Sequence, residues 1–257
     1  MHPILFRIGL ITIYSYGFML AVAFLVGIYL AKQEAARSKI PKEVILDLGL
    51  YVLISSIVGA RLLYVLLNLD FFLSSPSKII FLNEGGLVFY GGFITAIVVG
   101  FWYVIKKGLP LFKVADLVAP SVAVGQSIGR IGCLLYGCCY GCPTTLPWGM
   151  HFEIGSPAYG HYGSMSLHPT QIYSSLVNLS IFLILALRRP KARFEGEISL
   201  LYLILYGLSR FMIENLRGDN PEALLSLTHP QYLSLIIGIS AGIAYLIKKN
   251  ETRRLSQ

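Results

Sequence analysis

The stretch ILDLGLYVLISSIVGARLLYVLLN, residues 45–68, decides the fold. It holds only two charged side chains, Asp47 and Arg61, and most of the others are aliphatic. A helix of about 20 apolar residues is long enough to cross the hydrocarbon core of a bilayer. Residues 45–68 are therefore predicted to form a transmembrane helix.

The rest of the chain has the same character. Of its 257 residues, 55% are hydrophobic and 13% are charged, and its mean hydropathy is +0.68. We predict an all-α, polytopic integral membrane protein with one membrane domain, residues 1–257. The seven predicted spans are residues 13–31, 45–68, 87–105, 114–136, 171–187, 198–216 and 231–247. The first is read as a span rather than a signal peptide, because it lacks a cleavage pattern and begins a series.

The fourth predicted span is interrupted by Pro120 and by three glycines. Such residues are tolerated in membrane helices where neighbouring helices cover the exposed backbone. We therefore keep residues 114–136 as a span.

The basic residues predict the orientation of the spans. Fifteen lie in the first, third and fifth connections and in the C-terminal tail, and three lie on the other side. Cytoplasmic loops carry the Lys and Arg excess, so we predict the N-terminus outside and the C-terminus in the cytoplasm. The net charge of +8 is then a topology signal, and a nucleic-acid partner is not expected.

Three arginines, Arg61, Arg130 and Arg210, lie inside predicted spans. Each falls in the later part of a span that runs outward, so all three are expected in the outer half of the membrane. Glu214 follows Arg210 by four residues, on the same helix face. Because acids are scarce at this depth, the arginines predict a site for an anion, and arginine binds phosphate bidentately. We therefore predict a phospholipid headgroup site that opens to the outer leaflet.

Alternatives remain for these arginines. They could pair with acids or backbone carbonyls and hold helices together, and Arg61 could extend to the outer interface. Tyr16 and Tyr90 are expected at a similar depth, because they lie near the outer ends of inward-running spans. Gly91 and Gly92 would let the backbone bend or approach a ligand closely.

Ordered motifs give the chain a resemblance to a known family. They are SYGFM at residues 15–19, GARLLYV at 59–65, GGLVFYGG at 85–92, GRIG at 129–132, HPTQIY at 168–173 and YGLSRFMIENLR at 206–217. With these motifs the chain resembles the bacterial prolipoprotein diacylglyceryl transferases over nearly its whole length. Seven spans with an outside N-terminus also fit that family.

The resemblance implies a reaction, a location and partners. The enzyme would sit in the bacterial cytoplasmic (inner) membrane, with its active site toward the outer leaflet. Its substrates would be phosphatidylglycerol and a prolipoprotein whose signal peptide ends at a lipobox cysteine. The cysteine sulfur would attack the glyceryl carbon that bears the phosphate, giving a thioether and glycerol phosphate. Preorganised cations would stabilise the leaving anion and favour the thiolate. No metal or organic cofactor is implied.

The resemblance also implies roles for residues. Arg130 and Arg210 match the family's essential arginines, for phosphate binding and leaving-group stabilisation, and Glu214 would orient Arg210 or Arg217. The catalytic residues expected are Arg130, Arg210, Tyr90 and Glu214. The substrate-binding residues expected are Tyr16, Arg61, Gly91, Gly92, Gly129, His168, Tyr206 and Arg217.

The sequence departs from the family pattern at two places. Tyr90 stands where many relatives have a histidine that is a candidate base. A phenol, with a reference pKa of about 10, is a weak base at neutral pH unless cations lower its pKa. After Arg130 the usual pattern is G-N-x-x-N-G-E, and Cys133, Tyr136 and Cys138 replace its two asparagines and its glutamate.

The four cysteines, Cys133, Cys138, Cys139 and Cys142, allow several interpretations. An oxidising outer face favours disulfides. Other interpretations are simple packing of buried thiols, a cysteine that carries an acyl or glyceryl group, and a zinc site. The zinc site would join Cys138 and Cys142 to one of the histidines at positions 151, 161 and 168.

Two functions other than the main one stay open. The chain could be a lipid-binding or lipid-moving membrane protein without catalysis, which would share the buried arginines. It could also be a transferase of the same family with a different acceptor.

Overall fold

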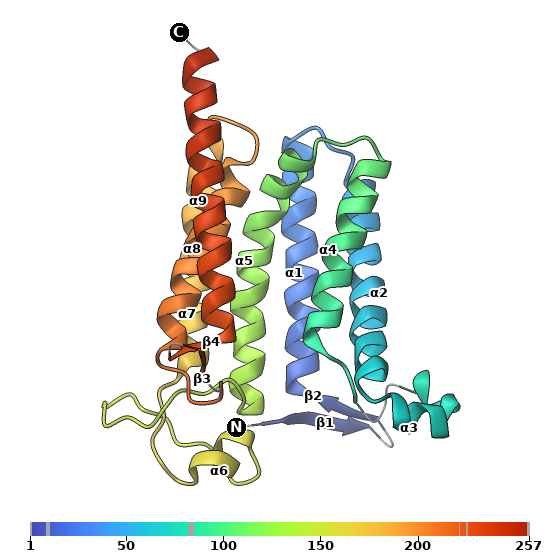
Figure 1. Cartoon of the computed structure of the whole chain (residues 1–257), viewed down its shortest axis with the longest axis vertical. Helices are drawn as coiled ribbons and strands as arrows, with labels where there is room; N and C mark the ends of the chain where they lie inside the picture. Colours follow the sequence, from blue (N-terminus) through green and yellow to red (C-terminus); the bar gives the residue numbers. More distant parts are fainter. Residues whose placement is uncertain (1, 9–10, 82–84, 221, 225, 256–257) are drawn as a thin grey trace. The chain divides into compact units, whose positions relative to one another are not determined.

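The computed structural model describes residues 2–8, 11–81, 85–220, 222–224 and 226–255. The chain divides into two compact units. One is Lys32–Val114, and the other combines two segments, Met1–Ala31 and Ala115–Gln257. The predicted single domain stays a prediction, and each unit is described by itself. Seven long helices match the seven predicted spans, which confirms the all-α class (Figure 1). They are α1 Ser15–Arg37, α2 Lys42–Leu67, α4 Phe89–Lys106, α5 Leu111–Tyr136, α7 Thr170–Arg188, α8 Glu197–Glu214 and α9 His229–Leu255.

Short elements connect these helices. They are the helices α3 Leu69–Ser74 and α6 Pro157–Tyr162, the 3-10 turns η1 Pro76–Ile79 and η2 Arg189–Lys191, and four strands. Strands β1 Ile4–Ile8 and β2 Ile11–Tyr14 pair antiparallel, as do β3 Glu222–Leu224 and β4 Leu227–Thr228. These two small sheets were not predicted from the sequence.

Six of the long helices are apolar enough to cross a membrane. Helix α8 is not among them, because it carries three charged residues, Glu197, Arg210 and Glu214. The chain is therefore a multi-pass membrane protein, while the seventh span and the orientation stay predictions. Helix α5 runs unbroken through Pro120, as the tolerance of membrane helices for proline allows.

In the Lys32–Val114 unit, glycines bring α2 and α4 into close contact. A Cβ on Gly91 would lie 2.6 Å from the Cβ of Leu63, and one on Gly92 would lie 2.7 Å from the Ser56 carbonyl oxygen. The Thr95 hydroxyl donates across the interface to the Ser55 carbonyl at 2.8 Å. Small residues and hydroxyl hydrogen bonds are the usual means of joining helices in a membrane.

In the other unit, α5, α7 and α8 share a buried apolar core. Its members are Ala119, Ala123, Ile181, Leu185, Ile198 and Tyr202. At one end of this core the Asp116 carboxylate of α5 accepts the Gly196 and Ser199 amides at 2.7 and 2.8 Å, which caps the start of α8. Beside it, Arg188 donates to the fully buried Glu197 at 2.8 Å. These contacts fix α8, whose other end carries the candidate site.

Candidate active site

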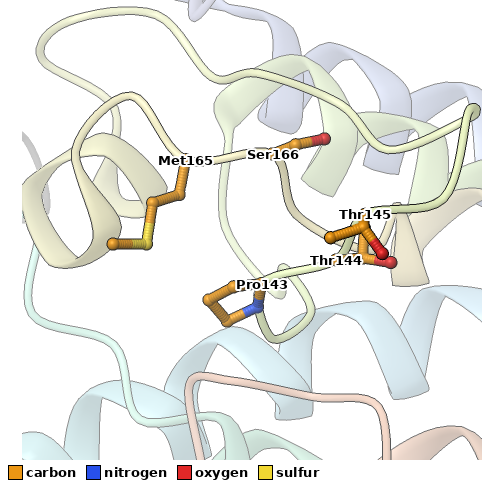
Figure 2. Close-up of a pocket in the computed structure, with 5 residues that line it drawn as sticks. All are labelled: Pro143, Thr144, Thr145, Met165 and Ser166. Atoms are coloured by element: carbon orange, nitrogen blue, oxygen red, sulfur yellow. The ribbon is translucent and has the colours of Figure 1, made fainter.

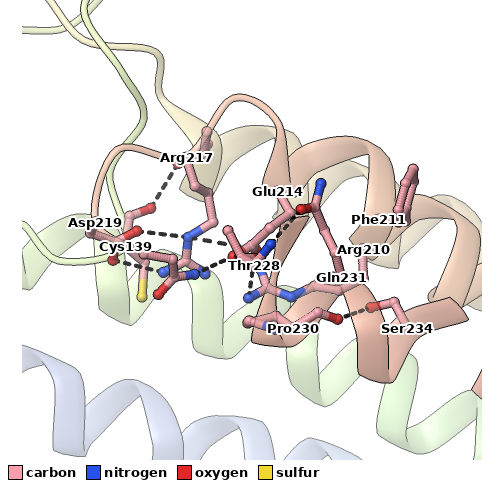
Figure 3. Close-up of polar contacts among 12 residues, drawn as sticks. Cys139, Arg210, Phe211, Glu214, Arg217, Asp219, Thr228, Pro230, Gln231 and Ser234 are labelled. Atoms are coloured by element: carbon pink, nitrogen blue, oxygen red, sulfur yellow. Dashed lines mark hydrogen bonds and ion pairs between the residues drawn. The ribbon is translucent and has the colours of Figure 1, made fainter. Parts of the chain in front are cut away.

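Arg210 and Glu214 form an ion pair at the end of α8 (Figure 3). They lie four residues apart, with Nη2 of Arg210 2.9 Å from Oε2 of Glu214. The Glu214 side chain has no solvent exposure, and its Oε1 accepts from the Asn220 amide and, at 3.1 Å, from the Thr228 hydroxyl. Glu214 is therefore held by contacts from three segments and in turn fixes Arg210.

Arg217 is neutralised by a different acid. Its Nε and Nη2 donate to the two carboxylate oxygens of Asp219 at 2.8 and 2.7 Å, a bidentate pair, and Nε lies 3.9 Å from Glu214. Burial disfavours the charge of Arg217, but the hydrogen bonds to Asp219 together with the charges of Cys139, Asp219 and Glu214 outweigh it, so the pKa of Arg217 lies above its usual value. The predicted partner Glu214 is thus secondary to Asp219.

Positive charge exceeds negative charge in this group. Glu214 and Asp219 face three arginines, because Arg130 also acts electrostatically on Arg210. Within the part of the chain that the structure describes, Arg130 makes no hydrogen bond or ion pair, and Nη1 of Arg210 is buried without a hydrogen-bond partner. A buried donor without a partner costs about 1–3 kcal/mol. The group is therefore suited to hold an anion.

Two tyrosines of the predicted site lie in this unit. Tyr206, one turn before Arg210, stacks on Tyr202 with ring centroids 5.7 Å apart. Tyr16, at the start of α1, packs its ring 6.4 Å from that of Tyr136 and shares the electrostatic surroundings of Arg130. Across the described residues neither phenol makes a hydrogen bond within the chain, so both hydroxyls are available.

Gly129 flanks Arg130 on the side of α5 that meets α1. A Cβ there would make an ordinary contact of 3.8 Å with Leu20, while one on Gly132 would lie 3.0 Å from the Cβ of Met19. Packing therefore requires a glycine at 132 more than at 129, and the predicted substrate contact of Gly129 stays a prediction.

The segment from Gly137 to Pro169 ties three helices together around Gly141. The Gly141 amide donates to the His168 carbonyl at 3.0 Å, and the next amide, of Cys142, donates to the Leu216 carbonyl at 2.9 Å. A Cβ on Gly141 would lie 2.5 Å from the Cβ of His168. The glycine therefore allows the ends of α5 and α8 and the start of α7 to meet.

The imidazole of His168 belongs to an aromatic group. Its Nδ1 lies 3.4 Å from the Tyr173 hydroxyl, which also accepts from Trp148 at 2.8 Å. Pro169 is the N-cap of α7. These contacts favour a structural role for His168 at this helix start.

In the Lys32–Val114 unit, Arg61 is surrounded by carbonyl oxygens. Its five N–H groups face five backbone acceptors at 2.6–3.1 Å, on Lys78, Ile79, Phe81, Gly85 and Gly86. The guanidinium also lies over the rings of Tyr64 and Phe72. No donor is left for a phosphate, so the structure favours the alternative in which carbonyls hold this arginine.

Tyr90, Gly91 and Gly92 begin α4 in the same unit. The two glycines are buried against α2, so the structure explains them by helix packing instead of ligand approach. Tyr90 is 50% exposed, and its ring meets the ring of Phe89 edge-on at 5.8 Å. The role of Tyr90 as a catalytic residue stays a prediction.

Part of the polar network was not predicted from the sequence. Asp219 stands two residues after Arg217, a spacing that could have suggested the pair. Thr228 reaches the site from the end of β4 and Gln231 from the start of α9, where the Gln231 amide donates to Asn215 at 3.1 Å. Nothing in their local sequence separates them from ordinary polar residues.

A shallow pocket lies elsewhere, in the long segment before α7 (Figure 2). It is lined by Pro143, Thr144, Thr145, Met165 and Ser166. The predicted site residues are not among its walls, so it carries no part of the candidate site.

All four cysteines carry free thiols. Those of Cys133, Cys138 and Cys139 lie together. His151 and His161, expected as possible zinc ligands, are instead in contact with the Ser164 carbonyl and the Tyr140 hydroxyl. The fold therefore does not bring together the zinc ligands considered from the sequence, which were Cys138, Cys142 and a histidine.

The fold and the site define a multi-pass membrane protein with a partly unpaired arginine group at one end of a helix bundle. The family model for prolipoprotein diacylglyceryl transferase matches residues 3–248. The chain belongs to the prolipoprotein diacylglyceryl transferase family, which confirms the resemblance.

Several relatives carry the name phosphatidylglycerol–prolipoprotein diacylglyceryl transferase. The Clostridium tetani protein is 37% identical over 242 residues, covering 93% of this chain and 96% of the relative. The Finegoldia magna protein is 34% identical, covering 96% of both chains. The Bacillus cereus protein is 35% identical, covering 83% of this chain and 80% of the relative.

Proposed function

We propose that this chain transfers the diacylglyceryl group of phosphatidylglycerol to a cysteine thiol of a prolipoprotein. A sulfur–carbon bond forms at the glyceryl carbon, the carbon–oxygen bond to phosphate breaks, and glycerol phosphate leaves with the electron pair. The observation that carries the proposal is the excess of positive charge at Arg130 and Arg210, which Glu214 offsets only in part, in a chain whose relatives bear the name of this reaction.

Arg130 and Arg210 act on the phosphate. The unpartnered Nη1 of Arg210 and the free guanidinium of Arg130 supply donors where negative charge grows on the leaving oxygen. Donors that are already in place need no reorganisation during the reaction, and removing one such donor lowers kcat by about 10²–10³.

Glu214 and Arg217 position these groups. Glu214 forms an ion pair with Arg210 and accepts hydrogen bonds from Asn220 and Thr228, so it orients Arg210 and is not the base. Arg217 donates through Nε and Nη2 to the carboxylate of Asp219, and this pair fixes the chain after α8. The free hydroxyls of Tyr206 and Tyr16 are suited to hydrogen-bond the headgroup or the thiol.

The site faces the outer leaflet of the bacterial cytoplasmic membrane, and the acceptor is the lipobox cysteine of a signal peptide. This orientation follows from seven spans, with α8 included, and from the Lys and Arg excess of the connections on the opposite side. The tightly packed partners of α8 shield its charged end from lipid.

The test is a transfer assay with the purified full chain in phosphatidylglycerol micelles and a lipobox peptide. We expect a thioether product by mass spectrometry, with one glycerol phosphate released per product. Arg210→Ala and Arg130→Ala should lower kcat by about 10²–10³, whereas Arg254→Ala, exposed near the end of α9, should not. A chain that retains phosphatidylglycerol but forms no thioether would be a lipid-binding protein without catalysis.

A further inference from the structure

Three thiols meet at the end of α5. The sulfurs of Cys133, Cys138 and Cys139 all lie within 4.8 Å of one another. Cys133 belongs to the last turn of α5 and is buried, and the other two follow the helix and are half-buried. Cys142 is not a member of this group, which we call the thiol triad.

The backbone brings the thiol triad together. Gly137 ends α5 with φ of +82°, and Cys139 has φ of +62°, a left-handed conformation that is uncommon for a residue with a side chain. Two side chains of α7 hold the turn: the Thr170 hydroxyl donates to the Cys139 carbonyl at 2.7 Å, and the Gln171 amide donates to the Cys138 carbonyl at 2.8 Å. The convergence of the sulfurs is therefore built into the fold.

The spacing suits a metal ion. A triangle with sides of 4.8 Å has its centre about 2.8 Å from each corner, and a zinc–sulfur bond is about 2.3 Å long. At a tetrahedral zinc the three sulfurs lie about 2.2 Å from the axis through the open position, so each sulfur needs to move inward by about 0.6 Å at most. Side-chain rotation of cysteine supplies such a movement without a change in the backbone.

Two arginines lie in the electrostatic surroundings of the thiol triad. Arg217 and Arg130 both act on Cys139, and Arg130 also acts on Cys133. Three thiolates with Zn²⁺ carry a net charge of −1, which the positive surroundings stabilise. Thiolate sulfur is also the ligand type that selects zinc over magnesium or calcium.

We propose that Cys133, Cys138 and Cys139 bind a zinc ion through three thiolates and leave its fourth tetrahedral position open. Three protein ligands with one open position are the usual arrangement of catalytic zinc, whereas structural zinc has four. This assignment replaces both the expectation of a site without metal and the ligand set of Cys138 and Cys142 with a histidine.

The open position takes the acceptor thiol, a role that rests on the proposed transferase function. A thiol that binds zinc loses its proton, which leaves to solvent. The bound sulfur then forms its bond to the glyceryl carbon as the bond from that carbon to the phosphate oxygen breaks. Zinc keeps its oxidation state, and the neutral thioether, a weaker ligand, leaves. The metal thus supplies the deprotonation of the acceptor thiol without a protein base.

The first experiment measures zinc without substrate. The full chain in detergent is reduced with a phosphine, stripped with a chelator, and titrated with Zn²⁺ against a chromophoric competitor. We expect one zinc per chain in the wild type and in the matched control Cys142→Ser. Cys133→Ser, Cys138→Ser and Cys139→Ser should each weaken binding by about tenfold or more. Co²⁺ should give a thiolate charge-transfer band that the same three variants lose.

Several results would overturn the zinc site. One is zinc binding that the three variants do not weaken. Another is a reduced chain that binds only Cu⁺, and a third is a chain isolated with a disulfide inside the thiol triad that binds no zinc after reduction. Circular dichroism of each variant shows whether lost binding merely reflects lost folding.

The second experiment compares transfer by stripped and zinc-restored chain. We expect activity to fall on stripping and to return with zinc. Equal transfer in both forms would overturn the role of zinc in transfer while the binding result stands. Zinc binding with no transfer in either form would instead contradict the proposed transferase function.

Discussion

Glu214 lies 2.9 Å from Arg210 across one turn of α8, with its side chain fully buried. Because the carboxylate also accepts from Asn220 and Thr228, its removal leaves several buried donors and a cation without partners. We expect Glu214→Ala to lower the free energy of unfolding by about 3–5 kcal/mol. Thermal unfolding in detergent measures this, with Glu251→Ala, exposed near the end of α9, as the control. Equal stability of the two variants would contradict the structural importance of the pair.

Arg210→Lys separates charge from geometry. Lysine keeps the positive charge but cannot present two parallel donors. We therefore expect the variant to fold and to retain phosphatidylglycerol, but to lose about tenfold to a hundredfold in kcat. Steady-state transfer kinetics with separate kcat and KM values check this. A kcat equal to that of the wild type would show that Arg210 acts only as a point charge.

Arg61→Lys tests whether Arg61 organises the chain or binds phosphate. The five carbonyls around Arg61 would lose most of their donors, and several of these contacts are exposed. We expect a loss of about 1–3 kcal/mol in stability, with kcat per folded molecule unchanged. Thermal unfolding and transfer rates are measured on the same preparation. A stable variant with a raised KM for phosphatidylglycerol would restore the phosphate role.

Gly91→Ala tests the packing of α2 against α4. The new methyl group would lie 2.6 Å from the Cβ of Leu63 and also against the backbone of Gly59. We expect the helices to be forced apart, with a loss of about 1–3 kcal/mol. Gly242→Ala in α9 is the matched control, because no atom lies within 4 Å of its Cβ position. If both variants unfold at one temperature, the close contact is not needed for stability.

The sequence predicted the helices well because length and hydropathy decide what can cross a bilayer. Predicted span 114–136 and helix α5, Leu111–Tyr136, differ by three residues at one end only. The arginine group was predicted in part, because Arg210 and Glu214 share one helix face. The partners of Arg61 were not predicted, because the sequence does not show which backbone carbonyls will lie near a side chain.

Other features depend on contacts between distant segments. Thr228 reaches Glu214 from fourteen residues away, and the thiol triad forms only because a turn with positive φ follows α5. Residue spacing in an irregular segment does not determine such a turn. The same reason explains why the small sheet of β1 and β2 was not predicted.

The three charged residues of α8 have a consequence for how the chain enters the membrane. A charged side chain raises the cost of inserting a lone helix, by about 2.5–3.5 kcal/mol at its centre and by less toward its ends, so α8, with three such residues, is a poorer candidate for independent insertion than the other long helices. Its neighbour α9 is apolar enough to insert, and the two helices touch at Gly207, where a Cβ would lie 2.8 Å from the Ser234 carbonyl oxygen. We expect α8 to enter the bilayer only as a hairpin with α9. Truncation before α9 would then leave the catalytic helix outside the membrane. Insertion of α8 would therefore be completed only after α9 has been synthesised.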